Sequence, residues 1–264
     1  MSFRSAATTL ILSLAASSAM AACTPIRVGY INQDHPPYWL GNGTSVASPP
    51  GAGVELLREF AASAACSAAL QRFPGLRLRQ ALESGAIDFA PMEEQPDMPP
   101  GIVLPKDRNG QPDRERAVRI VIAVFVRASD RLPPGTDPAL YFRGRRVGTT
   151  HGAPFAGQLR RAGLRVDDGA VDVARNFEKL KFGRIDGVAV TLIAPGDMDA
   201  YIAARYDGAI VRLNRPLSTS QVWLAANRAY YEGHREQVER MWTWLGNHGR
   251  ARFAALLRKY SNRE

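Results

Sequence analysis

Short apolar runs alternate with helical repeats along most of the chain. Runs rich in β-branched and aromatic residues predict strands, and these runs are Ile26–Ile31, Ala68–Phe73, 87–90, 119–126 and 220–225. Between several of these runs, apolar residues recur every three or four positions, as they do in 54–64 and 78–82, a spacing typical of amphipathic helices. The alternation predicts an α/β fold with parallel sheets.

Two segments depart from this alternation. Near the C-terminus, the apolar stripes 238–245 and 253–260 predict two helices that Gly246 and Gly249 separate, with the aromatic residues packed in the core. Residues 91–113 are rich in proline and charge and predict one long loop. Loops of that length are usually functional or mobile.

The pattern of the first half is repeated in the second half. Arg-Val-Gly at 27–29 returns at 146–148, and the junction Gly-x-Ile-Asp at 85–88 returns at 183–186. An amphipathic helix precedes each junction, and small apolar residues follow it. The sequence therefore predicts two α/β units of similar design on either side of the 119–126 strand.

The N-terminus is typical of an export signal. Arg4 precedes the apolar stretch 10–16, and small residues end the segment at Ala21. The stretch is shorter than the roughly 20 residues that a membrane-spanning helix needs. We therefore expect residues 1–21 to be a cleaved signal peptide and the mature protein to be soluble in the periplasm. The alternative is a buried N-terminal helix.

The two cysteines, Cys23 and Cys66, lie just before the first two predicted strands. If those strands are parallel neighbours, their starts lie side by side, and the oxidising compartment favours a disulfide. An alternative is lipidation of Cys23, because 20–23 loosely resembles a lipoprotein cleavage site with methionine in place of the usual leucine.

Composition narrows the class of partner. The 264 residues carry a formal net charge of +9, and their length suits one large domain or two of ordinary size. The arginines are scattered among acidic residues, as in 113–116, and form no basic block. This distribution argues against nucleic-acid binding and indicates a solvated basic surface, or a basic cleft for an anionic ligand.

No motif indicates catalysis. The four histidines are His35, His151, His234 and His248, and the chain contains no HExxH, P-loop, nucleophile elbow or complete GxGxxG. We therefore expect no enzyme activity, no cofactor and no metal site. A hydrolase assembled from residues far apart in the sequence is the remaining catalytic alternative.

Taken together, the motifs resemble a known family. The segments 26–30, 35–38, 53–57 and 144–148, with both Gly-x-Ile-Asp junctions, are similar to extracellular solute-binding proteins of family 3, the polar-amino-acid type of periplasmic binding protein. The resemblance covers nearly the whole chain after the signal peptide. It implies the type II periplasmic-binding-protein fold, with two Rossmann-like lobes joined by two crossover strands.

The resemblance also implies where the ligand binds. Lobe 1 would comprise residues 22–118 and 218–264, and lobe 2 residues 119–217. The lobes would close on a ligand by hinge motion. Ligands of open parallel sheets lie beyond the carboxyl ends of the strands. The candidate ligand-binding residues after the strands of lobe 1 are therefore Asn32, His35, Tyr38, Trp39, Met92 and Glu93.

In lobe 2, the corresponding candidates are Thr149, Thr150, His151 and Thr191. The amides near Gly152 precede a predicted helix, so they could bind a carboxylate or phosphate.

Two departures from the family pattern concern the ligand. Arg116 is the candidate for the arginine with which family members bind a carboxylate, but a different sequence replaces the usual Ser/Thr-rich run before it. Family members that bind α-amino acids usually carry an acidic residue shortly after the second junction, which holds the ammonium group. The corresponding stretch here, 187–191, contains no acidic residue and ends in Thr191. We therefore do not expect an ordinary α-amino acid as the ligand.

The leading hypothesis is a monomeric binding protein that captures a small polar molecule. It would deliver this molecule to the permease of an ABC transporter or report it to a membrane sensor. A second hypothesis is a degenerate relative that binds no solute and acts through protein contacts. A periplasmic hydrolase is the third.

Overall fold

The computed structural model describes residues 23–95 and 98–261. The predicted signal peptide, 1–21, and most of the alternative lipidation site therefore lie outside the described residues. Within the described ranges, none of the helices combines the length and the apolar character needed to cross a bilayer.

The strands form one continuous hydrogen-bonded path in the order β2-β1-β3-β10-β5-β8-β6-β7, with β4 paired to β10 and β9 paired to β5. The strands are β1 (Ile26–Ile31), β2 (Ala68–Phe73), β3 (Phe89–Glu93), β4 (Ile102–Val103), β5 (Val118–Arg127), β6 (Arg146–Thr150), β7 (Arg165–Ala170), β8 (Gly187–Leu192), β9 (Ile210–Arg212) and β10 (Ser218–Asn227).

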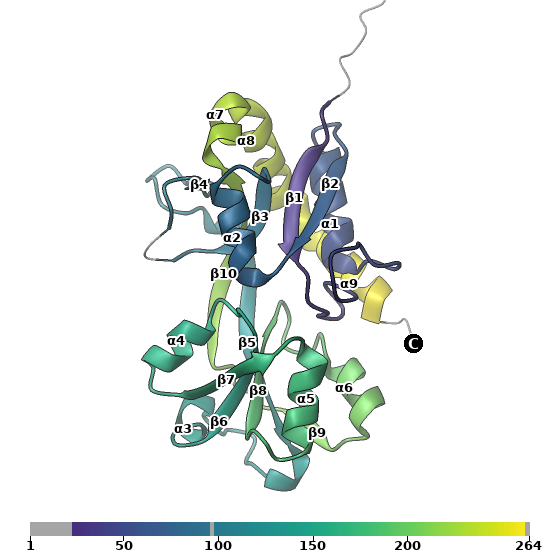
Figure 1. Ribbon diagram of the computed structural model, residues 1–264, viewed down its shortest axis with the longest axis vertical. Coiled ribbons are helices and arrows are strands. Elements are labelled where there is room, and N and C mark those ends of the chain that lie inside the picture. The colour runs from purple at the N-terminus through teal and green to yellow at the C-terminus, as the bar shows by residue number, and fades with distance from the viewer. Residues whose placement is uncertain (1–22, 96–97, 262–264) are drawn as a thin grey trace, which may run out of the picture.

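Helices cover the strands at both ends of this path. They are α1 (Ala52–Ala62), α2 (Gly75–Glu83), α3 (Pro138–Tyr141), α4 (Ala156–Arg161), α5 (Val173–Lys181), α6 (Asp199–Tyr206), α7 (Arg228–Gly233), α8 (Arg235–Trp244) and α9 (Arg250–Ser261). Figure 1 shows two lobes. The first lobe contains β1–β3 with α1, α2 and α7–α9, and the second contains β6–β8 with α3–α6.

Two long strands, β5 and β10, run between the lobes (Figure 1). The first half of β10 pairs antiparallel with β5, and its second half pairs with β3 of the first lobe. The later part of β5 pairs with β8 and β9 of the second lobe. Each crossing strand is thus a member of both lobes. The expected boundaries at 118/119 and 217/218 lie beside the first residues of these two strands and stay a prediction.

The repeated sequence motifs have a shared structural cause. The carboxylate of Asp88 accepts a hydrogen bond from the Arg27 backbone N–H at 2.8 Å, and that of Asp186 accepts one from the Arg146 N–H at 2.7 Å. A Cβ on Gly29 would lie 2.3 Å from the Ile87 Cδ1 atom. Each Gly-x-Ile-Asp junction is therefore hydrogen-bonded to the start of the first strand of its unit, β1 or β6, and a glycine in that strand leaves room for the junction isoleucine.

The same steric relation holds in the second lobe, where a Cβ on Gly148 would lie 2.5 Å from the Ile185 Cδ1 atom. A larger residue at either glycine would push the junction away from its strand.

The apolar faces of helices and strands that the periodicity predicts are buried in the cores of the two lobes. In the first lobe, Phe60 of α1 packs edge-on against Phe89 of β3, with ring centroids 5.0 Å apart. In the second lobe, Phe125 of β5 packs in the same manner against Phe177 of α5, at 5.3 Å. Trp242 of α8 is fully buried and donates its indole N–H to the Leu224 carbonyl at 2.6 Å, which anchors the C-terminal helices on β10.

Two predictions about local structure are wrong. Residues 91–113 do not form one long loop, because β3 continues to Glu93 and β4 pairs with β10. Gly246 and Gly249 do not separate the last two helices. Instead, a π-helical turn over Leu245–Gly249 joins α8 to α9, and a Cβ on Gly249 would lie 2.7 Å from the Leu245 Cδ1 atom. The glycines make this wide turn possible rather than ending the helix.

The predicted disulfide is confirmed. β1 and β2 are parallel neighbours with Ile26 opposite Ala68, and Cys23 is bridged to Cys66 with their Cα atoms 5.2 Å apart. The bridge uses the same sulfur atom that lipidation of Cys23 would modify.

We expect the double substitution of Cys23→Ser and Cys66→Ser to lower the free energy of unfolding by about 2–4 kcal/mol, because the bridge closes a long segment of the unfolded chain. The two cysteines are 43 residues apart in sequence. Urea denaturation measures the change. Alkylation of the unreduced wild-type protein, followed by intact mass measurement, should add no alkyl group; two added groups or an attached lipid would contradict the bridge.

Candidate functional site

A cavity of about 610 Å³ lies between the lobes. Its walls come from the loop after β1, the end of β3, both crossing strands, the turn after β6, and β8. The cavity therefore meets the carboxyl ends of strands from both lobes, as expected for open parallel sheets.

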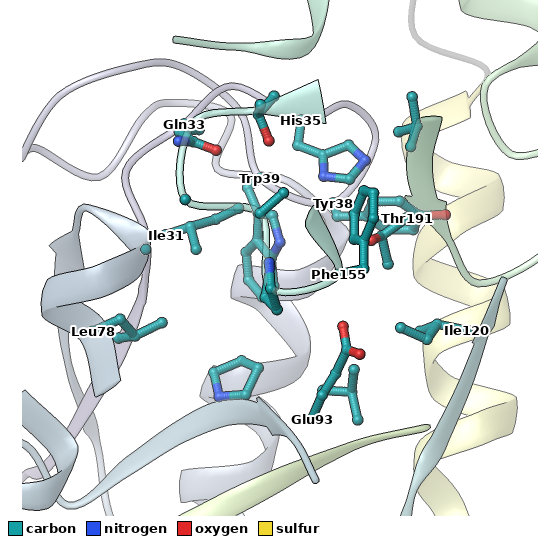
Figure 2. A pocket seen from close by; sticks show the side chains of 18 of the residues that line it. Ile31, Gln33, His35, Tyr38, Trp39, Leu78, Glu93, Ile120, Phe155 and Thr191 are labelled. Atoms are coloured by element: carbon teal, nitrogen blue, oxygen red, sulfur yellow. The ribbon is translucent and has the colours of Figure 1, made fainter. Parts of the chain in front are cut away.

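The walls are mainly apolar. Figure 2 shows Trp39, Ile31 and Leu78 of the first lobe around the cavity, together with Phe155 of the second lobe and Ile120 of β5. Trp39 is fixed in place. Its ring lies against the Gly53 backbone, where a Cβ would come within 2.5 Å of a ring carbon, and it packs against Tyr30 with ring centroids 5.2 Å apart.

The structure brings eight of the sequence-predicted site residues together. The residues that line the cavity are His35, Tyr38, Trp39, Met92, Glu93, Thr150, His151 and Thr191. Their ligand contacts stay a prediction. All eight lie at or just beyond a strand end, which is the signal that identified them.

Three predicted site residues lie outside the lining. Asn32 donates its backbone N–H to the Phe73 carbonyl at 2.9 Å and continues the β1–β2 ladder. Thr149 is fully buried beside Thr150, and successive residues of a strand point to opposite faces.

Arg116 also lies away from the cavity. Its guanidinium forms ion pairs with Asp113 at 2.9 Å and with Glu239 of α8 at 2.6 Å. The short 3₁₀ turn Arg114–Arg116 brings the side chain to α8, so Arg116 does not line the cavity, and its contact with a ligand carboxylate stays a prediction.

The sequence reasoning missed Asn176, a polar residue of the cavity wall. Asn176 lies on α5 and is only 1% exposed, and neither its side-chain oxygen nor its nitrogen has a hydrogen-bond partner. The available signal was its position between Val173 and Phe177, on the apolar face of a helix. A buried amide without partners costs about 1–3 kcal/mol for each unpaired group, so Asn176 favours a ligand or water that satisfies it.

Direct hydrogen bonds hold the lobes together beside the cavity. The Tyr38 hydroxyl donates to Asp197 Oδ2 at 2.5 Å and accepts from the Ile193 N–H at 2.9 Å. The Gln33 amide donates to the His151 carbonyl at 2.7 Å. Burial raises the pKa of Tyr38 well above its usual value, and the Asp197 carboxylate raises it further. Tyr38 therefore stays protonated and donates the hydrogen bond to Asp197. We call the hydrogen bonds among Tyr38, Asp197 and Ile193 the interlobe latch.

His35 is neutral inside the site. Burial lowers the pKa of its imidazole to about 4, against a backbone hydrogen bond with Thr191 that favours the charged form. Its Nε2 atom is buried without a partner.

Glu93 is the acidic group at the end of β3. Burial raises the pKa of its carboxyl, while the hydrogen bond that Ser220 donates at 3.1 Å lowers it.

No protein-family model matches the chain, and no curated protein sequence matches it. Solved structures are similar in fold. The ligand-binding core of GluR0 from Nostoc punctiforme, in complex with L-glutamate, has a TM-score of 0.65 at 17% identity, covering 89% of this chain and 99% of that one. A mutant of ArgBP from T. maritima also has a TM-score of 0.65 at 17% identity, covering 90% and 95%.

A histidine kinase sensor domain with similarity to periplasmic binding proteins has a TM-score of 0.64 at 19% identity, covering 89% of this chain and 95% of that one. At these identities the likeness establishes the fold. The predicted fold class, a two-lobed binding-protein fold with two crossover strands, is confirmed.

We expect Tyr38→Phe to shift the protein toward an open form by about 1.5–3 kcal/mol, because the variant loses a hydrogen bond to a charged group across the lobes. Small-angle X-ray scattering should then give a larger radius of gyration than for the wild type. Tyr231→Phe is the matched control, since the Tyr231 hydroxyl bonds to Glu239 within the first lobe. Identical scattering from wild type and Tyr38→Phe would refute the latch.

The His35 pKa predicts a loss of stability in acid. The pKa of the His35 imidazole is 6.5 in the unfolded chain and about 4 in the folded protein. The unfolded state therefore binds more protons between these two pH values. Stability therefore falls as the pH is lowered through this window, by about 2–3 kcal/mol from this group.

Urea unfolding across the window checks this expectation. His35→Gln should lose that part of the acid sensitivity, whereas His234→Gln, at the junction between α7 and α8, should keep it. If wild type and His35→Gln lose the same unfolding free energy between neutral and acidic pH, the expectation is contradicted.

Proposed function

We propose that this chain is a periplasmic solute-binding protein, which captures a small molecule between its lobes and presents the closed form to a membrane permease or sensor. The cavity size supports this function, because small-molecule sites usually enclose about 300–1,000 Å³. Residues of both lobes line it, so a ligand that touches both would favour closure.

The observation that carries the proposal is the set of buried polar groups without partners at the cavity. Both polar atoms of Asn176 and the Nε2 atom of His35 are buried and unpaired. In a core built for stability alone, apolar residues of similar size would avoid this cost. A bound solute that supplies hydrogen bonds would recover this cost.

The structural neighbours support the same class of function. One is a ligand-binding core and another is a sensor domain. The proposal includes export through a signal peptide and a monomeric state, and it involves no catalysis. It does not include an ordinary α-amino acid as ligand, since Arg116 is paired away from the cavity and Thr191 carries no charge.

A ligand that binds only the folded state should raise the melting temperature of the mature protein. At a concentration of about 100 times Kd, the added stability is about 2.7 kcal/mol. A thermal-shift screen over amines, organic acids, sugars and amino acids tests this, with native mass spectrometry to detect a molecule that co-purifies. No shift with any compound at millimolar concentration would favour the degenerate form that acts through protein contacts.

A cavity-filling variant locates the binding. Thr191→Trp should abolish the shift, because the larger side chain would occupy the cavity that Thr191 lines. Val211→Trp is the control in the same lobe, since Val211 is 43% exposed on β9 and away from the cavity. Retention of the full shift in Thr191→Trp would mean that the compound binds elsewhere.

A further inference from the structure

The chemistry of the cavity indicates the class of its ligand, provided that the proposed function holds. Glu93 ends β3 with its side chain directed into the cavity, toward the region of Phe155 and Trp39 (Figure 2). One carboxylate oxygen accepts a hydrogen bond from Ser220 at 3.1 Å. Among the described residues, no ion pair reaches Glu93.

The other charged groups of the lining have partners within the protein. Asp168 pairs with Arg160 at 2.8 Å, the Asp34 carboxylate accepts the Gly41 N–H at 2.7 Å, and Arg79 donates to the Gln95 side chain at 2.8 Å. The neutral His35 ring brings no positive charge at neutral pH.

The cavity thus differs in charge from the rest of the molecule. Its lining contains three carboxylates and two guanidinium groups, whereas the whole chain has a formal net charge of +9. Glu93 is half-buried, and partial burial of a carboxylate without a cation beside it carries a cost. A ligand that places a positive charge beside the Glu93 carboxylate would offset this cost.

The walls specify the rest of the ligand. Trp39 and Phe155 present aromatic surface and Ile120 presents aliphatic surface to the same cavity that Glu93 faces. Aromatic faces attract cations as well as hydrocarbon, so they suit a positive group on an apolar body. The rigid seat of Trp39 on Gly53 keeps this wall in place before a ligand binds.

We propose that the ligand is a small organic amine, whose protonated nitrogen pairs with Glu93 and whose apolar body lies against Trp39 and Phe155. This recognition needs no carboxylate on the ligand. It therefore agrees with the position of Arg116, which is held on Asp113 and Glu239. Ser220, on the crossing strand β10, orients the carboxylate that receives the amine.

Matched compounds of the same shape and different charge test the proposal. The probes are tryptamine, its alcohol tryptophol and indolepropionic acid, together with phenethylamine, phenylethyl alcohol and hydrocinnamic acid. Isothermal titration calorimetry at neutral pH measures each affinity for the mature wild-type protein. We expect the amine of at least one set to bind about tenfold to a hundredfold more tightly than its alcohol, and the acid to bind least.

Two variants test whether the Glu93 carboxylate causes the preference for the amine over the alcohol. Glu93→Gln keeps an acceptor for Ser220 but removes the charge, so it should lose the preference for the amine over the alcohol and fold at least as stably as the wild type. Glu94→Gln is the matched control, because its neighbouring carboxylate is exposed and does not line the cavity. It should keep the wild-type preference.

The outcomes separate this inference from the proposed function. Tighter binding of the alcohol or the acid would overturn the amine inference and leave the binding function intact. An amine preference that persists in Glu93→Gln would likewise overturn the inference alone. If Glu93→Gln does not fold, the comparison of amine with alcohol in the wild type still decides. If amines, alcohols, acids, sugars and amino acids all fail to bind, both the inference and the proposed function are wrong.

Discussion

Two antiparallel strands that belong to both lobes, β5 and β10, are the constraint on which this structure depends. They bond to each other through Val118–Ile122 and Ser218–Val222, and each then continues into a different lobe. The lobes are therefore joined to each other through this shared pair of strands. The carboxyl ends of the parallel strands face each other across this edge, so one cavity can take residues from both lobes. The apolar cavity wall, the Tyr38–Asp197 hydrogen bond and Glu93 all lie between the lobes that these strands join.

Closure in this fold is a balance between polar groups that find partners and polar groups that do not. Tyr38, Asp197 and the Ile193 amide satisfy one another across the lobes, and their bonds favour the closed form. Both polar side-chain atoms of Asn176 and the Nε2 atom of His35 are buried without a hydrogen-bond partner. A ligand shifts such an equilibrium only by its differential affinity for the two forms. A solute that contacts residues of both lobes would have that differential affinity.

The sequence predicted those features that depend on local pattern. Strand β1, strand β2 and the disulfide followed from runs of a few residues, and eight residues of the cavity lining followed from their place at strand ends. Features that depend on distant partners were not predictable in the same way. Arg116 is held by Glu239, 123 residues away, and no local pattern indicates that ion pair. Asn176 lines the cavity because α5 packs beside β6 and β8, which the sequence does not show. Its position on an apolar helix face indicated only that it would be buried.

The claim that the lobes close as two bodies on a shared pair of strands is tested most directly by an interlobe distance. Spin labels at Arg77 of α2 and Arg161 of α4 would lie on exposed positions of opposite lobes, and both native cysteines are bridged and unreactive. Pulsed electron–electron double resonance of the mature protein should show a longer distance between the two labels without solute and a shorter one with a solute that binds. A single distance, unchanged at saturation with a compound of proven affinity, would contradict the account.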